Sequence, residues 1–455
     1  MNAAVDFPLS QPEMTFTASG DALVRRTVLP NGVRILSEHM PGSRSATVGF
    51  WVAVGSRDEL PATATSPATF GSTHFLEHLL FKGTTSRTAL DIAIAFDAVG
   101  GEHNVLTAKE HTCYYAKVRD QDLPMAVDVI TDMLTSSLID PVEFENERGV
   151  ILEELSMMDD DPGDVANERF FEGVLGDHPL GRPIGGHPQS IIDVTRSSVM
   201  DHYRANYRAS DLVVTAAGAV DHDAFVARVS AALAAAGWPM DAIADPVERR
   251  TLVEAPIVPG KSLTVVHRPI EQVHVLIGGQ GIIAGDERRY TMSVLNSILG
   301  GGMSSRLFQE VREKRGLAYS VYSFAGSYSD AGVFGLSAAC APTKAPAVSE
   351  LMVAELHRLA DGGVTEAELE RAFGQLSGAS ALALEESETR MSRLGRAEIT
   401  LGEFGDFDET IRRLRLVGRD DVQALARDLA AQPLTVSAVG AVDESAFAPI
   451  LSGVR

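Results

Sequence analysis

Hydrophobic and polar residues alternate, or recur at helical spacing, along most of this chain, which predicts a mixture of strands and helices. Residues 24–27, 33–39 and 46–54 are typical of strands, and the turn Leu29-Pro30-Asn31-Gly32 separates the first two. Residues 1–22 are polar and show no period, so we expect a loose arm there.

The pattern continues with a helix at 86–99, which ends at Gly100-Gly101, and with strands at 102–107 and 111–119. Long helical stretches and strands do not alternate in a strict βαβ order. We therefore predict an α+β fold, in which a mostly antiparallel sheet is layered with helices on one face.

An internal repeat divides the chain. Residues 211–225 (DLVVTAAGAVDHDAF) match residues 433–447 (PLTVSAVGAVDESAF) at nine of fifteen positions, with an offset of 222. At an offset of 219, residues 74–87 lie over residues 293–306, with Leu, Gly, Ser and Arg in common. A period this long indicates paired domains and not a solenoid. We expect two homologous halves, 1–240 and 250–455, joined by a charged, proline-punctuated link.

One short motif carries candidate chemistry. His74-Phe75-Leu76-Glu77-His78 has the inverted zinc-peptidase pattern H-x-x-E-H. Residues three and four apart share a helix face, so His74, Glu77 and His78 point the same way. Two imidazoles one turn apart can bind one Zn²⁺, and the carboxylate between them can reach a water molecule. The second copy lacks these groups and has Ser293, Asn296 and Ser297 in their place.

A third ligand should come from another element. Residues 140–160 are predicted to form a helix, with Asp140 as its N-cap and Pro141 in the first turn. Glu147 and Glu154 lie seven residues apart, two turns, and so share a face. Taken alone, each of these carboxylates is more typical of a solvated surface charge than of a ligand.

The two histidines, Glu154 after 75 intervening residues and Glu147 before it resemble the pitrilysin and insulin-degrading enzyme family, most closely its processing-peptidase branch. The resemblance runs from about residue 25 over nearly the whole chain. It implies Zn²⁺ held by His74, His78 and Glu154, with Glu77 as general base and Glu147 assisting. It also implies two halves that enclose a central chamber.

The resemblance extends to substrate binding. Asn104 matches an exposed strand edge that holds peptide in the family, although His103 and Val105 depart from the family's small residues. His103 and His111 could be mistaken for ligands, but they are more typical of strand histidines. The connector 60–73 before the motif is longer than the family's usual one, which affects subsite preference.

In the second half, the family has an arginine and a tyrosine seven residues apart that contact substrate near the zinc. Arg312 and Tyr319 have this spacing, whereas Arg315 lies only four residues before the tyrosine. A tyrosine hydroxyl can donate to an oxyanion, and an arginine can hold a peptide carbonyl. Without the resemblance, a surface arginine and a core tyrosine would be the simpler interpretation.

Composition narrows the possible partners. The formal net charge is −23 and the pI about 4.9, which argues against nucleic-acid binding and leaves basic partners open. The same charge can also serve solubility alone. Two cysteines, no signal-peptide pattern and no run of 18 apolar residues predict a reduced, cytoplasmic setting away from the membrane.

Together these features predict a zinc metalloendopeptidase that hydrolyses peptides, with basic presequence-like segments preferred, and that forms a homodimer. The alternative is a non-catalytic peptide-binding or assembly subunit of a related peptidase. The intact Glu77 favours the enzyme.

Overall fold

The computed structural model describes residues 4–64 and 67–452. The chain folds into two compact units that are interleaved in sequence. Unit 1 comprises residues 1–155, 183–250 and 381–409, and unit 2 comprises residues 156–182, 251–380 and 410–455.

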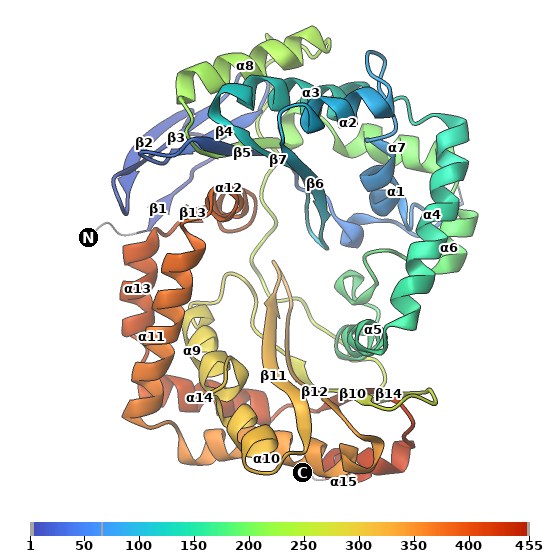
Figure 1. The fold of residues 1–455 in the computed structure, drawn as a ribbon, viewed down its shortest axis with the longest axis vertical. Helices are drawn as coiled ribbons and strands as arrows, with labels where there is room; N and C mark the ends of the chain where they lie inside the picture. Colours follow the sequence, from blue (N-terminus) through green and yellow to red (C-terminus); the bar gives the residue numbers. More distant parts are fainter. Residues whose placement is uncertain (1–3, 65–66, 453–455) are drawn as a thin grey trace. The chain divides into compact units, whose positions relative to one another are not determined.

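Unit 1 is built on a seven-stranded sheet with the order β2-β3-β4-β8-β5-β7-β6 (Figure 1). Neighbouring strands are antiparallel except for β4 and β8, which run parallel. The strands are β2 (Glu13–Ala18), β3 (Ala22–Val28), β4 (Arg34–His39), β5 (Ser45–Val52), β6 (Glu102–Thr107), β7 (Thr112–Arg119) and β8 (Leu212–Gly218).

Helices cover both faces of this sheet, which corrects the expectation of helices on one face. Helices α3 (Leu123–Ser136) and α8 (His222–Ala235) pack on one side, and α12 (Ser387–Arg396) on the other (Figure 1). Because side chains alternate along a strand, Trp51 of β5 faces α12, where a Cβ on Gly395 would lie 2.3 Å from its ring. Both faces of the central strands are therefore apolar and buried.

The N-terminal segment is ordered, and the expectation of a loose arm at 1–22 was wrong for its described part. Strand β2 pairs antiparallel with β3, and β1 (Val5–Asp6) pairs with β13 (Glu403–Phe404). Phe7 is fully buried and stacks on Phe404, with ring centroids 6.0 Å apart. The partners of β1 and Phe7 lie hundreds of residues away in sequence, so a local pattern could not reveal them.

Unit 2 repeats the sheet on a smaller scale, with the order β11-β12-β10-β14-β9. Its parallel pair is β9 with β14, the counterpart of β4 with β8. Its strands are β9 (Leu263–His267), β10 (Val273–Gln280), β11 (Ala318–Ser327), β12 (Gly332–Cys340) and β14 (Thr435–Gly440).

The shared Gly-Ala-Val-Asp sequence ends equivalent strands. Gly218 closes β8 with φ of 118°, and Gly440 closes β14 with φ of 149°. A Cβ on Gly218 would lie 2.2 Å from the carbonyl oxygen of Ser45, and one on Gly440 2.8 Å from a methyl of Val273. Only glycine fits this close approach, which explains why both copies carry it.

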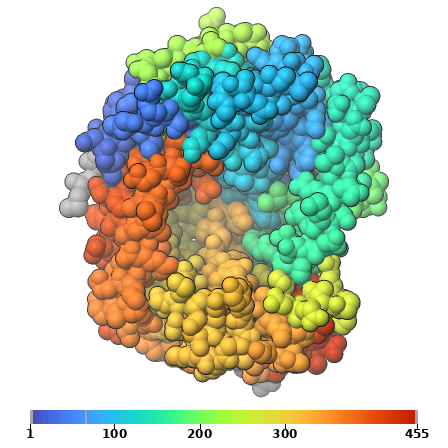
Figure 2. Space-filling model, viewed as in Figure 1, coloured from blue at the N-terminus to red at the C-terminus, as the bar shows by residue number. Residues whose placement is uncertain are grey.

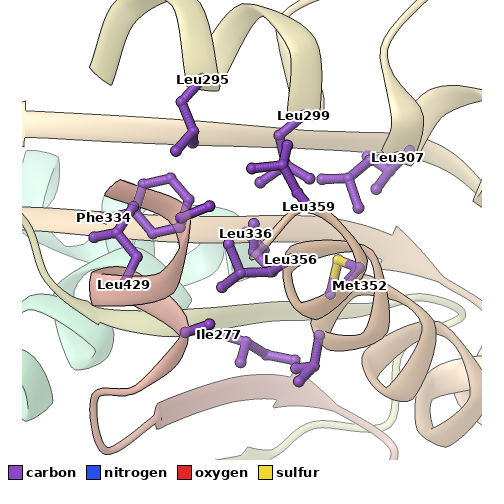
Figure 3. Close-up of a cluster of buried hydrophobic side chains, with 14 of the residues drawn as sticks. Ile277, Leu295, Leu299, Leu307, Phe334, Leu336, Met352, Leu356, Leu359 and Leu429 are labelled. Atoms are coloured by element: carbon purple, nitrogen blue, oxygen red, sulfur yellow. The ribbon is translucent and has the colours of Figure 1, made fainter. Parts of the chain in front are cut away.

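The core of unit 2 lies between one face of its sheet and helices α9 (Arg289–Gly300), α10 (Ala345–Gly362) and α14 (Arg419–Ala430). Figure 3 shows ten labelled side chains of this core, among them Ile277, Phe334 and Leu356. The other face packs against α5 (Pro162–Leu175) through a second apolar cluster that includes Phe170, Leu276 and Val439.

Helices α5 and α12 explain why the compact units are interleaved. Helix α5 lies between β7 and β8 in sequence but packs on β9, β10 and β14 of unit 2. Helix α12 lies between β12 and β14 in sequence but packs on β4, β5 and β8 of unit 1. Because these strands are equivalent in the repeat, each half gives the other the same covering helix.

The predicted α+β class with two homologous sheet-and-helix halves is confirmed. The continuous division into 1–240 and 250–455, and the enclosed chamber, stay predictions. Across the described helices, none combines the length and the apolar character that crossing a bilayer requires.

Candidate metal centre

Helix α1 (Ser72–Leu79) carries the motif and is held by its apolar side. Phe75, Leu76 and Leu79 are fully buried. This burial fixes the rotation of a helix only eight residues long, so His74 and His78 share the opposite face. The two imidazoles meet edge-on, with ring centroids 4.9 Å apart.

Helix α4 (Pro141–Asp160) brings Glu154 to the histidines. Its start is as predicted, because the carboxylate of Asp140 accepts a hydrogen bond from the backbone N–H of Val142 at 2.8 Å. The Oε2 atom of Glu154 lies 3.4 Å from the Nε2 atoms of both His74 and His78. Within the described residues, these three form the group of donor atoms that could share one metal ion.

The three separations fit a zinc ion. The Nε2 atoms of His74 and His78 lie 3.3 Å apart, and each lies 3.4 Å from Glu154. Ligands at about 2.0–2.1 Å from a tetrahedral Zn²⁺ are separated by about 3.3 Å. Two imidazoles and one carboxylate are also the donor set of open catalytic zinc sites.

The charges of the candidate ligands shift each other's pKa values. The hydrogen bond from His74 holds the pKa of Glu154 below its usual range. Burial of His74 opposes protonation, but Glu154 and Glu77 outweigh it and the pKa of His74 is raised. The negatively charged carboxylates around the imidazoles therefore favour binding of a cation.

Glu147 lies behind the candidate ligands. It is 3% exposed, and its Oε2 atom lies 2.9 Å from Nδ1 of His78. Its other oxygen pairs with Nζ of Lys82 at 2.7 Å. A carboxylate at Nδ1 accepts a hydrogen bond from the N–H at that atom and leaves Nε2 free to face a metal. Sequence analysis placed Glu147 at the site but did not reveal Lys82.

Glu77 is only partly buried and lies on the same turn as the candidate ligands His74 and His78. Its charge contributes to the raised pKa of neighbouring His74. Burial is the main cause that raises the pKa values of Tyr114 and Tyr207, and the charge of Glu77 adds to it. Glu77 therefore lies within one helical turn of His74 and His78 and remains partly accessible to solvent.

The contacts of Arg148 were also not revealed by sequence analysis. Its guanidinium lies over the rings of Phe144 and Phe75, 4.8 Å and 5.6 Å from their centroids. It also donates to the carbonyl oxygens of Ile191, Ile192 and Val194 at the end of α6 (Pro188–Asp193). Arg148 thus ties α4 to α1 and α6, while the outer side of α4, teal in Figure 2, lies at the surface.

The residues predicted to bind peptide in unit 1 lie at a sheet edge. Asn104 is exposed on β6, which pairs only with β7 in the described sheet. Its side-chain oxygen accepts a hydrogen bond from the N–H of Val105 at 2.9 Å. His103 stacks on Phe96 with centroids 4.3 Å apart, and burial lowers the pKa of His111 to about 4. Neither histidine belongs to the metal-binding group identified among the described residues.

Arg312 and Tyr319 lie together in unit 2. The guanidinium of Arg312 lies over the Tyr319 ring, 4.2 Å from its centroid, and donates to the Tyr319 carbonyl at 2.9 Å. Tyr319 is 75% exposed. Arg315 instead pairs with Glu310. Arg312 is therefore the arginine that orients this tyrosine.

In the second copy, the residues at the positions of the motif make hydrogen bonds within unit 2. In α9, the side-chain oxygen of Asn296 accepts from Ser323 at 2.7 Å, and Ser297 donates to Gln375 at 2.7 Å. The positions equivalent to Glu77 and His78 thus bind neighbouring side chains, and the loss of the metal-binding groups agrees with the packing.

Comparison with known proteins identifies the family. The family model for "Insulinase (Peptidase family M16)" matches residues 34–187, and that for "Peptidase M16 inactive domain" matches residues 193–376. The chain belongs to the peptidase M16 family. Two relatives named uncharacterized zinc proteases are 48% identical in Streptomyces coelicolor and 37% identical in Bacillus subtilis. The alignments cover 92% and 90% of this chain and 90% and 96% of the relatives.

Solved structures show the same fold. A protease from Helicobacter pylori superimposes with a TM-score of 0.81 at 22% identity, over 93% of this chain and all of that protein. A Pseudomonas fluorescens protein described as a peptidase M16 inactive domain gives 0.78 at 19% identity, over 94% and 98%. The family expectation is thereby confirmed, and so is zinc as the metal that its members use.

Proposed function

We propose that this chain is a zinc-dependent endopeptidase. The observation that carries the proposal is the convergence of His74, His78 and Glu154 at mutual distances of 3.3–3.4 Å. These residues would hold Zn²⁺ with one coordination position left open. When bound, zinc supplies a Lewis acid that polarises the scissile carbonyl and lowers the pKa of water.

Glu77 acts as the general base. Its partly exposed carboxylate next to the ligands accepts a proton from the attacking water and returns it to the amine that leaves. Glu147 is the assisting residue, and it acts by holding His78 in the orientation that directs Nε2 toward the metal.

The exposed edge of β6 would bind an extended peptide as an added strand, with Asn104 among the contacts. Main-chain hydrogen bonds then supply affinity, and side-chain pockets supply selectivity. Arg312 and Tyr319 would contact the same peptide across an enclosed chamber, where the tyrosine hydroxyl donates to the developing oxyanion.

We infer that the substrates are peptides with basic residues near the scissile bond, as in the processing-peptidase branch. The net charge of −23 supports this preference, since acidic walls attract basic segments. A homodimer in the cytoplasm completes the proposal, and nucleic acid and membranes are not expected as partners.

The test compares cleavage of a random peptide library by the full-length protein with and without a chelator. We expect cleavage that chelation abolishes and zinc restores. Tyr319→Phe and Arg312→Ala should each slow cleavage. Unchanged rates in both variants would contradict the proposed contact across the chamber. Peptide binding without any cleavage would instead support the non-catalytic subunit.

A further inference from the structure

The metal helix begins without a cap of its own. Gly71 is the N-cap of α1 and has φ of 87°, a conformation that favours glycine. A Cβ at this position would lie 2.5 Å from the Cδ1 methyl of Ile191, so a capping side chain would have to displace that methyl in addition to adopting the positive φ. The first backbone N–H groups of a helix lack partners within the helix, and here another element must supply them.

Glu59 supplies two of these partners. One carboxylate oxygen accepts from the N–H of Gly71 at 2.8 Å, and the other accepts from the N–H of Thr73 at 2.8 Å. Glu59 is 4% exposed. A buried carboxylate at the positive end of a helix forms charge-assisted hydrogen bonds, which are shorter and stronger than neutral ones.

Hydrogen bonds of the neighbouring residues also hold Glu59 and the start of α1 in place. The N–H of Leu60 donates to the Thr69 hydroxyl at 2.7 Å, and the N–H of Thr69 donates to the Leu60 carbonyl at 2.9 Å. On the helix itself, the Thr73 hydroxyl lies 3.3 Å from Nε2 of His202 in α7 (Arg196–Asn206). The first turn of α1 is thus fixed from two sides immediately before His74.

We propose that Glu59 is a positioning residue for the metal centre, a role that rests on the proposed function. It fixes the backbone at Gly71 and Thr73 and thereby sets the place of the His74 ring relative to Glu154. Because α1 has only eight residues, a small shift of its first turn moves both histidines.

The experiment measures metal binding by the full-length protein, by competition between zinc and a chromophoric chelator and by the visible spectrum of the cobalt(II)-loaded protein. Glu59→Ala removes both acceptors, and Glu59→Gln keeps one oxygen but turns an amide N–H₂ toward the second N–H. We expect Glu59→Ala to weaken zinc binding about tenfold or more, as for other residues that support ligands, and to change the cobalt spectrum. Glu59→Gln should show a smaller change of the same kind.

Asp221→Ala is the matched control. Asp221 caps α8 by accepting from the N–H of Ala224 at 2.8 Å, in the same unit but at a different helix. It should lower stability without altering zinc affinity or the cobalt spectrum. Wild-type zinc affinity and spectrum in Glu59→Gln, together with the same result in a folded Glu59→Ala, would overturn the role of Glu59.

The two proposals fail in different ways. If the wild-type protein binds zinc but cleaves no peptide, the endopeptidase assignment fails, while the affinity and spectra still decide the role of Glu59. If Glu59→Ala does not fold, Glu59→Gln decides the role, because it preserves the shape and one hydrogen bond.

Discussion

The Nδ1 atom of His78 lies 2.9 Å from the Oε2 atom of Glu147, which is buried and also paired with Lys82. This contact separates the roles of two carboxylates on one helix. Glu154 faces the Nε2 atoms where a metal would bind, whereas Glu147 holds an imidazole from behind. Both carboxylates lie on the same face of α4, two turns apart. Glu147 is buried and Glu154 is partly exposed, and this difference in burial distinguishes their roles.

Glu77→Gln should retain zinc and lose peptidase activity. The ligand geometry survives the change, but the amide cannot take the proton from water. We expect kcat to fall at least about 10²-fold, the usual contribution of a general base. Metal analysis beside steady-state kinetics checks this, and near-normal turnover in the zinc-loaded variant would contradict the assignment of Glu77.

Glu147→Gln should weaken zinc binding and activity together, by about 10–100-fold, because His78 loses the acceptor that orients it. Glu153→Gln is the control, since it removes an exposed carboxylate from the same helix. Zinc affinity measured by chelator competition distinguishes the two variants. If both behave alike, a general effect of charge explains the loss better than the orientation of His78.

Arg148→Lys should destabilise the protein by about 1–3 kcal/mol, since the lysine cannot reproduce the stacked guanidinium and its several carbonyl contacts. Glu145→Gln removes only the ion pair to Arg148, on a carboxylate that is 65% exposed, and should change stability by less than about 1 kcal/mol. Urea unfolding of both variants provides the comparison. Equal losses would mean that the ion pair, and not the packing, stabilises α4.

Acidification should destabilise unit 1 through His222. Burial lowers the pKa of His222 to about 4, against an ordinary value of 6.5, and Arg25 lowers it further while Asp221 and Asp223 oppose the shift. Its neutral ring is hydrogen-bonded to the hydroxyls of Thr27 and Ser37.

The folded-state pKa of His222 is depressed, so its contribution is complete above about 6.5 and is lost as pH falls toward 4. Thermal unfolding of the wild type and of His222→Gln between pH 7 and pH 4 measures the effect. The variant should show a shallower decline of Tm with falling pH. An identical slope would exclude His222 as a source of acid sensitivity.

The exchange of α5 and α12 predicts that the halves fold together. A fragment of residues 1–240 lacks α12 and would expose the face of its sheet that carries Trp51. It would also leave Arg26 without Glu398, although both side chains are fully buried in the intact chain. We expect the fragments 1–240 and 250–455 to be poorly folded alone and to become helical and zinc-binding when mixed. Circular dichroism and zinc titration check this, and a stable 1–240 fragment would show that α12 is dispensable.

The sequence by itself determined the features that depend on local spacing or on repetition. The motif at His74–His78 specifies two imidazoles on one helix face because three- and four-residue intervals always align on a helix. The repeat specified two related sheets, because strands β8 and β14 need the same glycine for the same close approach. The choice of Arg312 and Tyr319 came from the family resemblance and not from the spacing alone, and their contact with each other is seen only in the structure.

Only the tertiary structure decided which distant segments meet. The contacts of Glu59 with α1, of Arg148 with α6 and of Lys82 with Glu147 depend on how separate elements pack. The strand β2 and the covering helix α12 also acquire their places from partners outside their own local pattern. A local pattern reports which face of an element is apolar, but the identity of the surface that covers it is settled by the packing of the whole chain.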